Sequence, residues 1–201
     1  MSEDKKLART VGNCYYLWPS PARLAVLYLQ KAPDMPDQIT EVLNHQQIAD
    51  RIRRISWQIY EDFLGEQEVI LAGIAERGYQ LAILLSKELS AISPLAVEVM
   101  RIKVNKEDPL AKAPELDGST KLEGKHVIVV DDVLNSGATL IYGVRYFLDY
   151  RVKGIKTAVL VDRSHKNYPV KGDFKGISLS TSIQEHVQVQ LDKEPYSVVI
   201  S

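Results

Sequence analysis

Two adjacent carboxylates, Asp131 and Asp132, directly follow four consecutive aliphatic residues, 127–130. Such a run is typical of a strand buried on both faces of a parallel sheet. A short polar turn comes next, and from Leu140 onward the apolar residues recur at helical spacing. The order strand, acidic pair, turn, helix predicts a ligand site, because open α/β sheets bind ligands at the carboxyl ends of their strands.

The polar turn consists of Asn135, Ser136, Gly137, Ala138 and Thr139. It precedes a helix, whose first amide groups favour an anion, and Gly137 lets the backbone approach that anion closely. The acidic pair cannot bind the same phosphate, because like charges repel. Carboxylates accept hydrogen bonds from hydroxyls or bind a hard cation. The favoured ligand therefore carries a phosphate at one end and a sugar diol, with Mg²⁺, beside it, as a ribose 5-phosphate does.

Residues 127–139 resemble the phosphoribosyl pyrophosphate (PRPP) signature of type I phosphoribosyltransferases. Four aliphatic residues, Asp-Asp, two apolar residues, one variable residue and Ser/Thr-Gly-x-Thr occur here in that order. An ordinary buried strand with a capped helix would explain the hydrophobic run but not the acidic pair. The resemblance implies that Asp131 and Asp132 are catalytic, contact the ribose hydroxyls and bind Mg²⁺ directly or through water. It also implies that the turn 135–139 binds the 5-phosphate.

A second strand-loop-helix unit is predicted from Glu68 onward, with a loop bracketed by Gly73 and Gly78. In the resemblance this loop binds pyrophosphate through Ala75, Glu76, Arg77 and Gly78. Arg77 is implied to be catalytic, since its guanidinium can bridge two oxygens. The nearest pattern is that of the pyrimidine operon attenuator proteins with uracil phosphoribosyltransferase activity, which usually read Lys-Thr-Arg-Gly. This chain has lost one cation and gained one anion there, and an ordinary Gly-bounded loop is the alternative.

Residues 161–192 are similar to the end of the attenuator family, where Asp-Arg-x-His, Asp-aromatic-x-Gly and Val-Gln-Leu-Asp recur in this order. In related enzymes the aromatic residue stacks on the nucleobase and the next residue presents its backbone, which implies Phe174 and Lys175. Alternatively Phe174 is a core residue. His165 is interpreted as a loop hydrogen-bonder rather than a general base. The 6-oxopurine enzymes usually carry Asp where this chain has Asn135, and an amide cannot serve as the base that accepts the proton. A pyrimidine acceptor, or no base chemistry at all, is therefore favoured.

The resemblance implies an α/β fold of the type I phosphoribosyltransferase class. Such a fold has an open, mostly parallel sheet flanked by helices, a small C-terminal hood and a flexible lid loop. We expect an N-terminal extension over residues 1–40 and a phosphoribosyltransferase domain over residues 41–201. Within this domain the lid is expected at 105–125 and the hood region at 163–201. The extension could instead be upstream sequence ahead of a shorter natural form that starts at Met35.

Two further segments allow local predictions. An amphipathic helix is predicted where isoleucines recur after Asn44, with Gln47 three residues later as an N-cap signal. Its off-stripe arginines are interpreted as a solvated face in preference to an RNA or phosphate patch; they are Arg51, Arg53 and Arg54. Apolar alternation that changes phase around Val99 predicts a strand with a bulge or a bend there.

Composition limits the classes of function. The 201 residues are 45% hydrophobic and 25% charged, which is typical of one globular domain, and the net charge is −1. RNA binding is possible through a local patch but is not indicated by charge. The single Cys14 excludes an internal disulfide and favours a cytoplasmic protein. We expect PRPP and a nucleobase as partners, a homo-oligomer and no membrane association.

The predicted activity is Mg²⁺-dependent transfer of phosphoribose from PRPP to uracil, with release of pyrophosphate. A PRPP- or nucleotide-sensing regulator that binds RNA is the alternative. A binding domain with a degenerate site is disfavoured, because the signature turn is intact.

Overall fold

The main element is a six-stranded sheet with the strand order β4-β3-β2-β5-β6-β7. The computed structural model describes residues 39–104, 115–117, 121–163, 165–182 and 184–201, and residues 39–201 form one compact unit. The strands are β2 (Glu68–Ile74), β3 (Ala96–Lys103), β4 (Glu115–Asp117), β5 (His126–Leu134), β6 (Gly154–Arg163) and β7 (Phe174–Leu179). All neighbours are parallel except β3 and β4. The predicted open, mostly parallel α/β sheet is confirmed.

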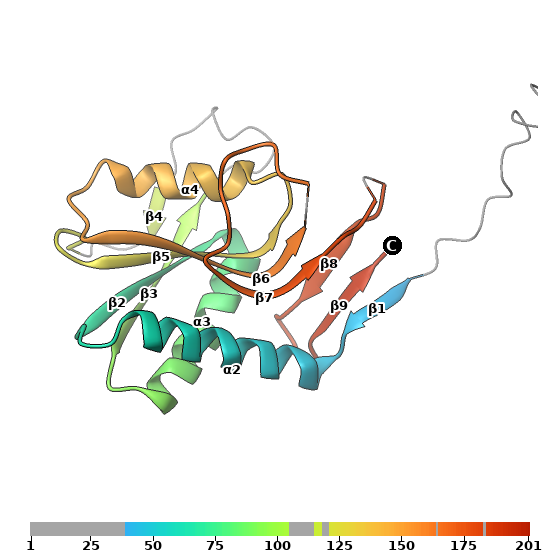
Figure 1. The fold of residues 1–201 in the computed structure, drawn as a ribbon, viewed down its shortest axis with the longest axis horizontal. Helices are drawn as coiled ribbons and strands as arrows, with labels where there is room; N and C mark the ends of the chain where they lie inside the picture. The colour runs from blue at the N-terminus through green and yellow to red at the C-terminus, as the bar shows by residue number, and fades with distance from the viewer. Residues whose placement is uncertain (1–38, 105–114, 118–120, 164, 183) are drawn as a thin grey trace, which may run out of the picture. The chain divides into compact units, whose positions relative to one another are not determined.

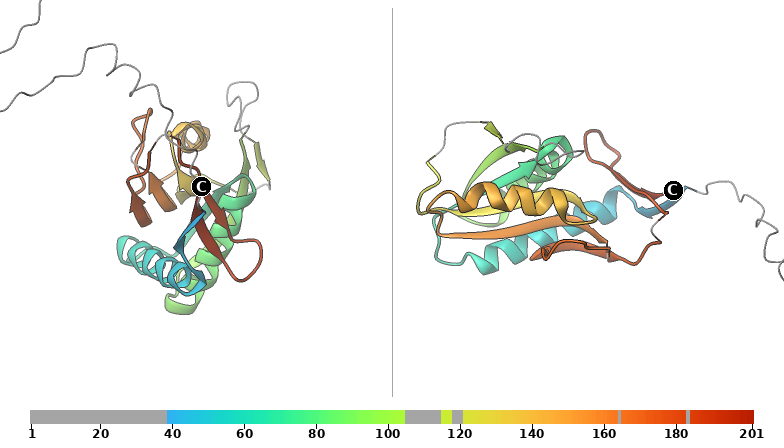
Figure 2. Two further views of the ribbon diagram at one scale, coloured as in Figure 1. Left: turned by 90° about the vertical axis from the view of Figure 1, so that its right-hand side faces the viewer. Right: turned by 90° about the horizontal axis from the view of Figure 1, so that it is seen from above.

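Helices cover both faces of this sheet. The helices α2 (His45–Asp62) and α3 (Ala75–Ile92) lie on one face and α4 (Ala138–Leu148) on the other (Figures 1 and 2). Along β5, Ile128 and Val130 pack in the core under α2 and α3, whereas Val127 and Val129 pack in the core under α4. This burial on both faces is the reason for the unbroken aliphatic run. Among the described residues, no helix is both long and apolar enough to cross a membrane.

The helix α2 begins with the predicted capping box. The Asn44 side chain accepts the Gln47 amide at 3.0 Å, and the Gln47 side chain accepts the Asn44 amide at 3.0 Å. Two of the three off-stripe arginines make local contacts: Arg54 donates to the carbonyl oxygens of Lys175 and Gly176, and Arg53 pairs with Glu88. Arg54 thereby covers the backbone of the edge strand β7.

The predicted bulge in β3 is wrong. Residues 96–102 of β3 pair with residues 68–74 of β2 in one continuous parallel register. The alternation changes phase because both faces of β3 are covered. Val97 and Val99 pack toward α3, whereas Met100 and Ile102 fill the core on the α4 side.

A second, antiparallel sheet forms the hood beyond the carboxyl ends of the main strands (Figure 1). It contains β1 (Thr40–Leu43), β9 (Ser197–Ile200) and β8 (Val187–Gln190) in that order. Two details differ from the expectation of a hood within residues 163–201. The strand β1 comes from the start of the domain, and β7 belongs to the main sheet, where Phe174 pairs with Ala158 of β6.

The expected lid and the expected extension fall largely outside the described residues, which omit 1–38, 105–114 and 118–120. Inside the expected lid, however, β4 forms an edge of the main sheet and pairs antiparallel with β3, so Asp117 lies opposite Arg101. The sequence showed no periodicity there, because a three-residue strand is too short to carry one.

Candidate functional site

The predicted phosphate turn lies between the end of β5 and the first turn of α4. Gly137 is the N-cap of α4 and has a left-handed φ of 86°. The Ser136 hydroxyl accepts the Ala138 amide at 3.3 Å. Asn135 and Ser136 face a pocket, and Ala138 and Thr139 open the helix. The turn therefore joins hydroxyl groups to the amide end of a helix, a combination that suits a phosphate.

The chain around residues 167–170 braces this turn from outside. The Ser136 carbonyl accepts the amides of Asn167 at 2.8 Å and Tyr168 at 3.2 Å. A Cβ on Gly137 would lie 2.6 Å from Val170 Cγ1. Glycine is therefore required at position 137 for two reasons: the backbone is left-handed, and Val170 packs where a Cβ would lie.

The acidic pair is buried where β5 leaves the core. Asp131 and Asp132 are 3% and 4% exposed, and Asp131 Oδ1 accepts the Asp132 amide at 3.0 Å. Because side chains alternate along a strand, Asp131 lies on the α4 side and Asp132 on the α3 side. Arg77 Nη1 of α3 lies 3.9 Å from Asp132 Oδ2. This ion pair thus joins the first turn of α3 to the acidic pair at the end of β5.

The expected pyrophosphate loop is in fact the first turn of α3. The helix begins at Ala75, directly after β2 ends at Ile74. Ala75 has a φ of 52°, a left-handed conformation that costs a non-glycine residue about 1–2 kcal/mol. A Cβ on Gly78 would lie 2.5 Å from the Val130 carbonyl, so glycine lets this turn pack directly against β5. The strain at Ala75 and the missing Cβ at Gly78 together bring the helix start beside the acidic pair.

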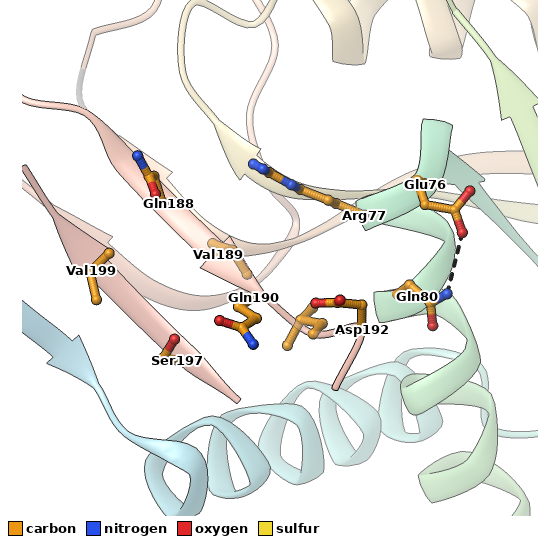
Figure 3. A pocket seen from close by; sticks show the side chains of 10 residues that line it. Glu76, Arg77, Gln80, Gln188, Val189, Gln190, Asp192, Ser197 and Val199 are labelled. Carbon is orange, nitrogen blue, oxygen red and sulfur yellow. Dashed lines mark hydrogen bonds between the residues drawn. The ribbon is translucent and has the colours of Figure 1, made fainter. Parts of the chain in front are cut away.

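A cavity of about 490 Å³ lies between the first turn of α3 and the hood (Figure 3). Arg77 extends toward Gln188 of β8, and Asp192 lines the same cavity from the end of that strand. Glu76 points to the other side, where Gln80 donates to its carboxylate at 3.3 Å. One cation, Arg77, therefore faces the space between the acidic pair and the hood.

A second pocket, of about 360 Å³, lies beside the phosphate turn. It is lined by Asn135, Ser136, Arg163, His165, Lys166, Asn167 and His186. Its far wall is held by Arg163, which is 4% exposed and donates to Thr181 Oγ1 at 2.8 Å and to the carbonyls of Ser182 and Glu185 at 2.9 Å. The pocket volume and its flat imidazole side chains suit a nucleobase.

His165 acts as the expected loop hydrogen-bonder, because its Nε2 contacts the Thr181 carbonyl oxygen. A carbonyl can only accept, so Nε2 carries the proton in this contact. His165 therefore ties residues 165–167 to the segment that leads into His186.

The structure places Phe174 and Lys175, which the resemblance assigns to the base, outside the lining of both pockets. Phe174 is 6% exposed and lies in the core on the α2 and α3 side. The Lys175 carbonyl accepts from Arg54, and its Nζ donates to Asp162 at 3.1 Å. Both residues lie at the start of β7, level with the middle of β6 and under α2, so neither lines the two pockets described above.

The donor set fits a metal only together with its substrate. Asp131 and Asp132 supply hard oxygen ligands, but among the described residues no group of three His, Cys, Asp or Glu side chains could hold a metal ion. Mg²⁺ commonly keeps several waters and takes its remaining ligands from carboxylates and substrate phosphates. The residues present therefore suit a Mg²⁺ ion that arrives with a phosphorylated ligand.

Several residues of the site were missed in the sequence. Arg163 belongs to the Asp-Arg-x-His run of the resemblance but was given no role there. His186 had no recognisable signal, because its position beside Asn135 depends on contacts between distant segments. Asp192 belongs to the Val-Gln-Leu-Asp run that the sequence analysis noticed without giving it a role. Arg101 of β3, which pairs with Glu76 at 2.9 Å, was not singled out either.

The chain is thus an α/β protein with two predicted anion-binding sites, the turn 135–139 and the first turn of α3. An acidic pair lies with them at the carboxyl edge of one sheet. Comparison with known proteins specifies the class further. Residues 38–194 match the family model of the phosphoribosyl transferase domain, and the chain belongs to this family.

The chain is similar to curated relatives along most of their length. It is 33% identical to the "Bifunctional protein PyrR" of Haemophilus ducreyi over 159 residues, which cover 75% of this chain and 89% of the relative. It is 34% identical to that of Bacillus pumilus over 169 residues, or 78% and 93% of the two chains.

Solved structures agree in fold. A hypoxanthine-guanine phosphoribosyltransferase from Bacillus anthracis superposes with a TM-score of 0.66 at 20% identity, over 82% of this chain and 99% of that chain. The hypoxanthine phosphoribosyltransferase of Trypanosoma cruzi gives a TM-score of 0.65 at 20% identity, over 80% and 95% of the two chains. At this identity the likeness concerns the fold alone.

Proposed function

We propose that this protein transfers the phosphoribosyl group of PRPP to uracil, yielding uridine monophosphate (UMP) and pyrophosphate. The observation that carries the proposal is the convergence of three groups at one sheet edge. The phosphate turn 135–139, the buried acidic pair and Arg77 meet there, with 3.9 Å between Arg77 and Asp132. PRPP presents a 5-phosphate, a ribose diol and a diphosphate in the corresponding order.

Each group has one task in this scheme. The amides and hydroxyls of residues 136–139 bind the 5-phosphate, and Asp131 and Asp132 accept hydrogen bonds from the ribose hydroxyls. Arg77 binds the diphosphate and stabilises the negative charge that develops on it as the bond to C1 breaks. A base nitrogen forms the new bond to C1, and its proton passes to solvent. Holding the two reactants in line is the main contribution of the protein.

Asp131 and Asp132 would hold Mg²⁺ directly or through water. The bound ion would neutralise part of the diphosphate charge.

The pocket between Asn135 and His186 supports a pyrimidine acceptor. It borders the phosphate turn through Asn135 and Ser136, so a base there would lie next to the bound phosphoribosyl group. The amide of Asn135 can donate and accept hydrogen bonds but cannot take up a proton, which a 6-oxopurine acceptor would require of this position. The resemblance of residues 161–192 to the attenuator proteins with uracil phosphoribosyltransferase activity favours the same acceptor.

The test is titration calorimetry of PRPP with Mg²⁺, followed by uracil, hypoxanthine and guanine with assay of pyrophosphate release. Release with uracil alone is the expected result. Release only with a purine would contradict the acceptor assignment, and absence of PRPP binding would contradict the whole proposal.

The first turn of α3 favours a second candidate, a regulator that senses PRPP or a nucleotide and binds RNA. Glu76 places an anion in the turn that would bind pyrophosphate, which opposes turnover. This second candidate predicts that the protein binds PRPP and RNA but releases no pyrophosphate with any base. That combination of results would favour the regulator over the transferase.

The identity of the base-stacking ring has its own test. His186→Ala should weaken UMP binding by about 10-fold, since base stacking is worth roughly 1–3 kcal/mol. Phe174→Leu should lower the melting temperature instead and leave the UMP affinity unchanged, because Phe174 is a core residue. Loss of UMP affinity in Phe174→Leu but not in His186→Ala would instead identify Phe174 as the ring that stacks on the base.

A further inference from the structure

Arg101 on β3 contacts the first turn of α3 from outside the two pockets. Its Nη1 lies 2.9 Å from Glu76 Oε2, and its guanidinium carbon lies 4.4 Å from the centroid of the Tyr79 ring. Arg101 pairs in register with Gly73, so it reaches α3 from the neighbouring strand at the level where β2 ends. The Arg101 side chain is 33% exposed, and its buried Nε has no hydrogen-bond partner among the described residues.

Glu76 is thereby held on one side of the turn and Arg77 on the other. The Glu76 carboxylate receives the Arg101 guanidinium and the Gln80 amide, whereas Arg77 points toward the hood (Figure 3). Glu76 and Arg77 are adjacent in sequence, and both line the cavity that Arg77 faces. A Glu76 carboxylate released from Arg101 would be free to pair with Arg77 and would repel a diphosphate at the same place.

We infer that Arg101 is a positioning residue for the diphosphate-binding site that the first turn of α3 forms with Arg77. It neutralises Glu76 and holds that carboxylate away from Arg77, so the guanidinium of Arg77 remains available to a diphosphate. Arg101 supplies, from a different strand, positive charge next to a turn whose first two residues, Ala75 and Glu76, contain no cation. The inference rests on the proposed function, because it assigns a diphosphate to this turn.

The experiment compares Arg101→Gln, Glu76→Gln and the double variant with the unmodified chain by calorimetry. The probes are PRPP with Mg²⁺, pyrophosphate with Mg²⁺, and UMP, which has the 5-phosphate but no diphosphate. Lys103→Gln is the matched control, because Lys103 lies on the same strand and its ion pair, at 2.7 Å, is with Asp117 of β4.

Arg101→Gln should lower the affinity for PRPP and for pyrophosphate by about 10-fold and leave the affinity for UMP unchanged. The reason is that the Glu76 carboxylate, once released, repels only the diphosphate. The double variant should return to within about 2-fold of Glu76→Gln, because a neutral residue 76 no longer needs a cation. Lys103→Gln should leave the affinity for all three probes unchanged.

Three results would overturn the inference. They are unchanged PRPP affinity in Arg101→Gln, an equal loss of UMP affinity, and a double variant as weak as Arg101→Gln. Loss of PRPP binding in the unmodified chain would be a different failure, that of the proposed function. A melting temperature measured for each variant identifies misfolding, and if Arg101→Gln does not fold, Arg101→Lys, which keeps the charge, should retain PRPP affinity within about 3-fold.

Discussion

The guanidinium of Arg77 lies 3.9 Å from the buried carboxylate of Asp132. This contact joins α3, which follows β2, to the end of β5, the neighbouring strand. Arg77 is exposed over about half of its side chain, whereas Asp132 is almost fully buried, so the arginine is free to exchange this partner for a ligand. The relationship places a cation and a buried anion where a ribose diphosphate needs both.

Replacing Asp131 and Asp132 together by Asn should abolish PRPP binding. Asn has nearly the same volume, so the packing is kept, but the charge that accepts ribose hydroxyls and Mg²⁺ is lost. We expect a fall in PRPP affinity of at least about 100-fold, since hydrogen bonds to charged groups contribute roughly 1.5–3 kcal/mol each. Calorimetry with Mg²⁺ measures it, with the exposed Asp149→Asn at the end of α4 as control. Full PRPP affinity in the double variant would refute the site assignment.

Gly137→Ala should damage both stability and phosphate binding. The residue has a φ of 86°, and a Cβ would collide with Val170. Gly124→Ala is the matched control, because Gly124 has a φ of 75° with open space around its Cβ position. Both variants should lose about 1–2 kcal/mol in the free energy of unfolding from backbone strain. Only Gly137→Ala should also lower the affinity for UMP. Equal UMP affinity in the two variants would argue against the turn as the phosphate-binding site.

Ala75→Gly should stabilise the fold, contrary to the usual effect of glycine in a helix. Ala75 has a φ of 52°, which glycine adopts without strain. We expect a gain of up to about 1 kcal/mol in the free energy of unfolding, whereas Ala49→Gly within α2 should lose about 1 kcal/mol. Chemical denaturation of both variants checks the contrast. A loss at Ala75 comparable to that at Ala49 would show that the left-handed conformation carries no strain.

Arg163→Lys should loosen the pocket beside the phosphate turn. Lysine keeps the charge but cannot reproduce the fork that donates to Thr181, Ser182 and Glu185. UMP binding should weaken about 10-fold and PRPP binding should stay within about 2-fold, because only UMP occupies the base pocket. Arg54→Lys, which also loses contacts to two carbonyls but lies under β7, is the control for stability alone. Equal losses of UMP affinity in Arg163→Lys and Arg54→Lys would show that Arg163 has only a structural role.

Glu66 should make stability depend on acid pH. A hydrogen bond from Lys153, at 2.6 Å, lowers the pKa of Glu66 below its ordinary value of 4.5. A carboxyl group whose pKa is lowered by folding stabilises the folded state above its unfolded pKa and loses that contribution as the pH falls through its folded pKa. The difference in melting temperature between the unmodified chain and Glu66→Gln should therefore shrink as the pH falls below about 4.5. A difference independent of pH would exclude this linkage.

The sequence alone determined the features that are local in the chain. The capping box at Asn44, the aliphatic strand β5 and the Gly137 turn depend on residues a few positions apart, so their patterns predict backbone conformation directly. For the same reason the acidic pair and Arg77 could be named, and the structure brings them together.

Tertiary structure decided what depends on contacts between distant segments. Phe174 has the sequence context of a base-stacking residue, but α2, more than a hundred residues earlier, covers it. The hood includes β1 because β9 needs a partner on each side, and Thr40 lies opposite Ile200. Arg101 meets Glu76 only because β3 and β2 align in parallel register. Burial and ion pairing of this kind follow from how helices and strands pack, and no local pattern of residues encodes them.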